Sequence, residues 1–133
     1  MMKKIAILLL SLGVSLSSFA DQPVSSDARI KTYIYNPSEV FKLVMNSGYQ
    51  SSIEFAEGEE IETISLGDLF AWKVNPVENR VFVKPMEDDI HTNMTIITNK
   101  RTYYFDLFSK EPDGDMDPEL VYVMRFFYPE KNQ

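Results

Sequence analysis

The stretch TNMTIITNKRTYYFDLF, residues 92–108, decides the fold class. Apolar and polar side chains alternate from Met94 to Thr98 and again from Thr102 to Phe108. Alternation with a period of two is typical of a half-buried β-strand, and the residues between the two runs, Asn99-Lys100-Arg101, are suited to a turn. The stretch therefore predicts a β-hairpin. It contains no nucleophile beside a base, so its Tyr and Phe side chains suit a sheet rather than a catalytic site.

Short alternating runs of the same kind recur along the chain and are separated by turn residues. They cover residues 29–35, 51–56, 69–74, 80–85 and 120–129, with a shorter segment around Ile61 and Ile64. Residues 36–55 are ambiguous, because Asn36-Pro37 with Glu39 resembles a helix start while Asn46-Ser47-Gly48 is typical of a hairpin turn. We favour the hairpin. Many short strands at close spacing predict an all-β fold, a β-sandwich of short antiparallel strands.

The first twenty residues have the pattern of a cleavable signal peptide. Lys3 and Lys4 precede an apolar run from Ile5 to Val14, and Ser18-Phe19-Ala20 supplies small residues for cleavage before Asp21. We therefore expect a signal peptide over residues 1–20 and one exported domain over residues 21–133. The chain has no cysteine, so neither a lipid anchor nor a disulfide framework is expected.

The charge of the chain argues against two classes of partner. The formal net charge is −7. Loss of Lys3 and Lys4 with the leader leaves 11 basic residues against 20 acidic ones, a net charge of −9. A surface of this sign disfavours binding to the nucleic acid backbone and to anionic lipid.

The sequence shows no arrangement typical of catalysis or of a tight metal site. His91 is interpreted as a solvated loop residue, since a single His without Cys cannot by itself form a zinc site. Asp113, Asp115 and Asp117 alternate as calcium ligands do, but the Gly and Glu of a calcium loop are missing, which leaves at most a weak site. The carboxylate pairs Glu59-Glu60 and Asp88-Asp89 lie in runs that read as exposed. We expect no enzyme activity, no cofactor and no metal.

Apolar alternation also predicts which side chains form the core and which are available to partners. Gly48 and Gly67 are predicted to hold turn conformations. The predicted core is Trp72, Phe70, Ile53, Phe55, Val81, Val83, Ile96, Tyr103 and Phe105. The aromatic residues beyond this core either contact other proteins or lie half-buried under loops; they are Tyr33, Tyr35, Tyr104, Phe108, Tyr122, Phe126 and Tyr128. Lys84, Pro85 and Arg101 are predicted to be exposed and to make polar contacts between subunits.

Five segments in order resemble one family. They are DARIKTYIYNPSEVFKL, GYQSSIEFAEGEEIETISLGDLFAWKV, RVFVKP, TNMTIITNKRTYYFDL and VMRFFYPE. Together they resemble the N-terminal domain of the ninth VirB protein, in the CagX/TrbG-like family of periplasmic type IV secretion components. The resemblance implies a β-sandwich that assembles in many copies into the inner ring of the core complex. It further implies contact with the tenth VirB-type protein and with copies of itself or of a full-length paralogue.

The sequence departs from the family in one respect. Family members usually carry a second β domain, which contacts a small outer-membrane lipoprotein, whereas this sequence ends at Gln133. We therefore expect a truncated form or a short paralogue, and do not transfer the functions of the second domain. Two other functions stay open: a periplasmic β module that binds a small ligand, and, with less support from the residues, an exported hydrolase.

Overall fold

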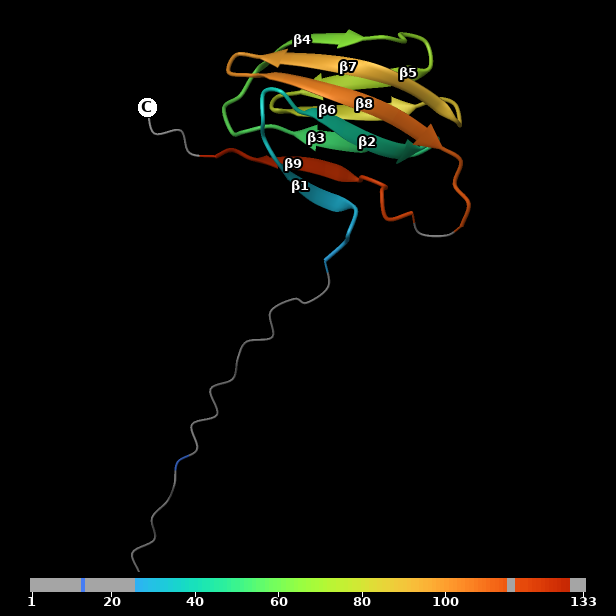
Figure 1. Ribbon diagram of the computed structural model, residues 1–133, viewed down its shortest axis with the longest axis horizontal. Coiled ribbons are helices and arrows are strands. Elements are labelled where there is room, and N and C mark those ends of the chain that lie inside the picture. The colour runs from blue at the N-terminus through green and yellow to red at the C-terminus, as the bar shows by residue number, and fades with distance from the viewer. Residues whose placement is uncertain (1–12, 14–25, 115–116, 130–133) are drawn as a thin grey trace, which may run out of the picture.

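The computed structural model describes residue 13, residues 26–114 and residues 117–129. Within these ranges the chain forms two β-sheets that face each other across one core, and it has no helix (Figure 1). The prediction of an all-β sandwich is confirmed. The predicted signal peptide lies outside the described ranges, apart from Gly13. The strands are β1 (Ile30–Ile34), β2 (Val40–Asn46), β3 (Ser51–Glu54), β4 (Ile61–Leu66), β5 (Trp72–Val77), β6 (Arg80–Pro85), β7 (Ile90–Thr98), β8 (Thr102–Lys110) and β9 (Val123–Phe127).

The expectation that the strands are antiparallel is only partly right, because both sheets contain parallel as well as antiparallel pairs. The five-stranded sheet has the order β1-β9-β3-β6-β5, and the four-stranded sheet has the order β2-β8-β7-β4. Parallel pairs join β1 to β9, β3 to β9 and β2 to β8. In the five-stranded sheet β1 and β5 are therefore the edges, and in the other sheet the edges are β2 and β4.

The hairpin predicted from residues 92–108 is confirmed. β7 and β8 pair antiparallel, with Ile97 opposite Thr102 and Thr95 opposite Tyr104. β7 begins at Ile90, earlier than expected, so the interpretation of His91 as a loop residue is wrong. The His91 ring lies on the outer face of the sheet and stacks on Phe108, with 4.1 Å between ring centroids.

The hairpin predicted within residues 36–55 is wrong, although both of its strands exist. β2 pairs with β8 in one sheet, while β3 pairs with β6 and β9 in the other. The turn through Gly48, whose φ is 81°, thus leads the chain from one sheet to the other. The helix start is also not formed: the Asn36 side chain accepts a hydrogen bond from the N–H of Ser38 in a local turn, but the residues that follow pair with β8 as strand β2 instead of continuing as a helix.

Side chains from both sheets fill the space between them. Every predicted core residue is buried except Phe70, which is 96% exposed. The Asp68 carboxylate accepts hydrogen bonds from the N–H groups of Phe70 and Ala71, so a turn precedes β5 and the strand alternation begins only at Trp72. The prediction for Gly67 also needs correction, because its φ lies outside the left-handed region. A Cβ there would instead lie 2.5 Å from the side-chain oxygen of Asn93. The described residues contain no helix of the length and apolar character that a membrane span requires.

Candidate interaction site

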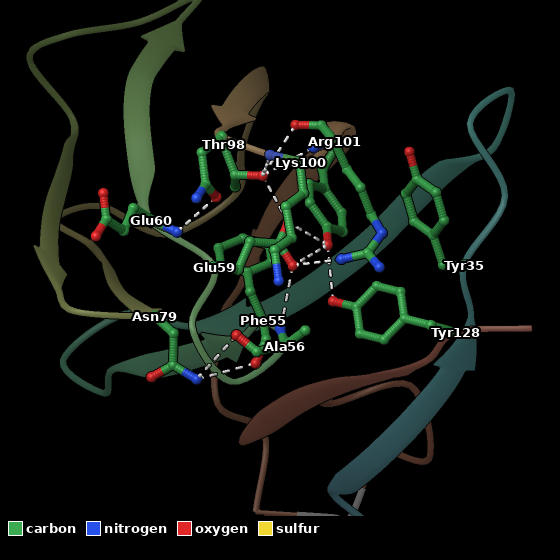
Figure 2. Close-up of polar contacts among 12 residues, drawn as sticks. Tyr35, Phe55, Ala56, Glu59, Glu60, Asn79, Thr98, Lys100, Arg101 and Tyr128 are labelled. Atoms are coloured by element: carbon green, nitrogen blue, oxygen red, sulfur yellow. Dashed lines mark hydrogen bonds and ion pairs between the residues drawn. The ribbon is translucent and has the colours of Figure 1, made fainter. Parts of the chain in front are cut away.

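A buried carboxylate lies at the end of the sandwich where β7 turns into β8 (Figure 2). Glu59 comes from the short turn between β3 and β4, and it is only 2% exposed. Its N–H donates to the carbonyl of Ala56, and its carboxylate accepts from the N–H of Ala56 at 3.2 Å. The expectation that Glu59 is exposed is therefore wrong: the turn closes on itself and directs this side chain into the sandwich.

Three side chains donate hydrogen bonds to the Glu59 carboxylate. Arg101 Nη1 lies 2.6 Å from Oε1, and Thr98 Oγ1 lies 2.5 Å from Oε2. Tyr103 Oη lies 2.9 Å from Oε2 and donates its proton to the carboxylate. The Tyr103 oxygen then accepts from the hydroxyl of Tyr128, at 2.7 Å. A buried charge needs such a complete set of partners, because an unpaired one costs several kcal/mol.

The same contacts fix the shape of the β7–β8 turn. Thr98 Oγ1 accepts hydrogen bonds from the N–H groups of Lys100 and Arg101, at 3.1 and 3.0 Å. Asn99 binds the neighbouring turn twice, since its N–H donates to the Glu60 carbonyl and its side-chain oxygen accepts from the Glu60 N–H. The two turns are thus joined by backbone and side-chain bonds, with Glu59 behind them.

Two tyrosine rings hold the guanidinium of Arg101 in place. Arg101 Cζ lies 3.8 Å from the centroid of the Tyr128 ring and 5.6 Å from that of Tyr35. Burial lowers the pKa of Arg101, whereas the neighbouring Glu59 carboxylate raises it, and the net shift of the pKa is upward. Burial raises the pKa of Tyr128 to about 12, and it raises the pKa of Tyr103 still further. At neutral pH the arginine is therefore charged and both phenols are protonated.

A pocket of about 800 Å³ opens beside this network and is called the end pocket here. The rings of Tyr35, Tyr104 and Tyr128 form walls, and Lys100 and Arg101 supply positive charge. No carboxylate lines the end pocket among the residues that the structure describes. It combines apolar walls with a few placed polar groups, as binding pockets generally do.

The residues predicted to contact partners are spread over several places. Tyr35, Arg101, Tyr104 and Tyr128 meet at the end pocket. Tyr33 and Phe126 pack against the core, Phe108 lies on the outer face of β8, and Tyr122 is exposed beside Arg29. Lys84 is exposed as expected. Arg101 is less exposed than predicted, since its side chain is only 25% exposed. Pro85 is buried, because it ends β6 on the inward face opposite Trp72.

A second surface was not assigned a role by sequence reasoning. On the edge strand β1, Ile34 is 67% exposed and lies opposite Phe127, which is 60% exposed. Ile30 is exposed on the same face. We call Ile30, Ile34 and Phe127 the edge patch. Apolar side chains beside an open strand edge could have been suspected from the alternation of residues 29–35, but the sequence does not show which strand is an edge.

No metal centre is found in the described part of the chain: no group of three or more His, Asp or Glu side chains there is arranged to hold an ion. The alternating acidic residues of the loop after β8 include Asp115, which lies outside the described ranges. The filled core, the open β1 edge and the braced end pocket together define an all-β domain with surfaces suited to other proteins.

Comparison with known proteins identifies the family. Residues 28–133 match the CagX family, described as a conjugal transfer protein, and the chain belongs to this family. It is 36% identical over 121 residues to the type IV secretion system protein virB9 of Bartonella henselae, covering 85% of this chain and 42% of that protein. It is 29% identical to the type IV secretion system protein PtlF of Bordetella pertussis, covering 80% of this chain and 46% of that protein. The resemblance seen in the sequence is thus confirmed at the level of the family, and the chain spans less than half the length of these relatives.

Proposed function

We propose that the protein is a structural subunit of a type IV secretion system and acts by assembly with other proteins. The observation that carries this proposal is the family match over residues 28–133, together with 36% identity to a virB9 protein over most of the chain. The relatives are named as secretion system proteins. We further propose that the protein works in the periplasm, in the inner ring of the core complex, beside the tenth VirB-type protein and copies of itself or of a longer paralogue.

The surfaces described above support assembly rather than turnover. The edge patch offers exposed apolar side chains next to unpaired backbone groups, which is how an edge strand accepts a neighbour. The filled space between the sheets argues against a small-ligand site inside the sandwich, because core side chains occupy it. Acting without catalysis and without a cofactor is part of the same proposal.

Gene deletion in cells that carry the matching secretion system tests the proposal. We expect substrate transfer to fall on deletion and to recover with the wild-type chain. A chain with Ile34→Lys should fold but restore transfer poorly, because the charge disrupts the edge patch. Ser65→Lys, on the exposed face of β4, is the matched control and should restore transfer. Unchanged transfer in the deletion strain, together with absence of the wild-type chain from the core complex purified from complemented cells, would reject the proposal.

A further inference from the structure

We propose that the end pocket binds a carboxylate side chain carried by an acidic segment of a partner protein. The inference deepens the proposed function, because the partner would be a component of the same assembly.

The guanidinium of Arg101 is positioned to receive a second carboxylate. An arginine has five N–H donors in a planar fork. In the described part of the chain Nη1 of Arg101 donates to Glu59, and the guanidinium also interacts with the Tyr103 hydroxyl. Figure 2 shows the guanidinium between the rings of Tyr35 and Tyr128, with Glu59 on one side only. Its remaining edge is available to the pocket, and its side chain is 25% exposed. A guanidinium held close to aromatic rings loses little freedom when it pairs with a carboxylate.

Charge complementarity favours an acidic occupant. The chain as a whole carries 20 acidic and 13 basic residues, yet the described lining of the end pocket has two cations and no carboxylate. Lys100 makes no ion pair with any described residue, so its ammonium group is available. Glu59 lies behind the pocket wall, and its charge is shared among several donors. The local field therefore attracts an anion although the protein is acidic.

The walls of the pocket fit a peptide rather than a free ion. The volume of about 800 Å³ is far larger than one carboxylate. The rings of Tyr104 and Tyr128 offer contact area for apolar side chains next to the acidic one, whereas Tyr35 is almost wholly buried. The expected ligand is thus a short extended segment in which Glu or Asp alternates with apolar residues.

Titration with a defined peptide tests this inference. The probe is acetyl-Leu-Glu-Leu-Glu-Leu-amide, and the matched probe has Gln in place of each Glu. Two-dimensional ¹H–¹⁵N spectra of the purified protein follow the Nε–H signal of Arg101 and the amide signals of residues 98–104. We expect the Glu peptide to shift these signals and to bind about tenfold more tightly than the Gln peptide, because charge-assisted hydrogen bonds are lost with Gln.

Two lysine variants separate the pocket from general charge attraction. Lys100→Glu should weaken binding of the Glu peptide about tenfold, because it places a like charge at the pocket. Lys73→Glu makes the same charge change on exposed β5, away from the pocket, and should change affinity less than about twofold. Equal binding of the two peptides, or equal losses in the two variants, would overturn the inference.

Residues 130–133 follow Pro129 in the sequence, and Pro129 lies at the pocket rim, so a truncated chain is needed as a control for occupation by the chain itself. If only a chain ending at Pro129 bound the Glu peptide, the pocket would belong to that segment and the partner assignment would fall. Failure of the protein to enter the core complex would reject the proposed function without affecting these titrations, so the two proposals can fail separately.

Discussion

Replacing Glu59 with glutamine is expected to destabilise the fold strongly. The change keeps the shape of the side chain but removes the charge that pairs with Arg101 at 2.6 Å. Removing one partner of a buried ion pair typically costs about 3–5 kcal/mol. The Arg101 side chain is 25% exposed and can turn toward water, so we expect the lower end, about 3 kcal/mol. For a domain of this size that corresponds to a fall in melting temperature of roughly 12 °C.

Urea denaturation followed by tryptophan fluorescence measures this free energy directly. Trp72 is the only tryptophan and is buried, so its emission reports unfolding of the core. Glu60→Gln is the matched control, because Glu60 is the adjacent residue and is exposed. Its free energy of unfolding should change by less than about 0.5 kcal/mol.

A double variant tests whether the pairing is the cause. Arg101→Met removes the cation, so adding it to Glu59→Gln should cost less than the sum of the two single changes. The reasoning would be refuted if Glu59→Gln were no more destabilising than Glu60→Gln. It would also be refuted if the effects of the Glu59 and Arg101 changes simply added.

Three further predictions follow from burial and from the pKa shifts. Trp72→Ala should lower the free energy of unfolding by roughly 3–5 kcal/mol, measured by circular dichroism. Trp72→Phe should cost less, because the indole N–H has no hydrogen-bond partner within the described structure. Equal losses in the two variants would contradict this. Phe70→Ser should change stability by less than about 0.5 kcal/mol, since this side chain points to solvent; a large loss would place it in the core. The pKa of Tyr128 is raised from 10.0 to about 12, so the folded state favours the neutral phenol. The contribution of this shift to the free energy of unfolding is complete below pH 10 and is lost as the pH rises toward 12. Tyr128→Phe should therefore flatten the loss of stability between pH 10 and pH 12 in parallel denaturation curves, and an unchanged slope would contradict the assigned environment.

The positions of most strands were predicted well, because the alternation of polar and apolar side chains depends only on residues adjacent in the sequence. The β7–β8 hairpin and the burial of Trp72 follow from period-two patterns alone. Strand pairing is a property of distant residues, so the sequence could not show that β2 joins β8 in parallel rather than turning back onto β3. Phe70 was wrongly assigned to the core. The apolar alternation of the sequence includes Phe70, but the turn formed by the Asp68 carboxylate places this residue before the strand begins.

Only some of the residues at the end pocket were predicted from the sequence. Aromatic residues in excess of the core indicated a contact surface, and Tyr35, Tyr104 and Tyr128 do line the pocket. The buried position of Glu59 was missed, since a run of Glu beside Gly normally forms a solvated turn. Only the meeting of that turn with Thr98 and Arg101, some forty residues later, makes a buried carboxylate favourable there.

The most direct test of the account is the mass of the complex that contains this protein in cells with the matching secretion system. A tagged chain, purified gently from the envelope and sized by sedimentation, should migrate in a large complex together with other secretion components. It should be present there in many copies. A chain that sediments alone at the mass of one subunit, with no secretion component bound, would contradict the claim that the protein acts by assembly.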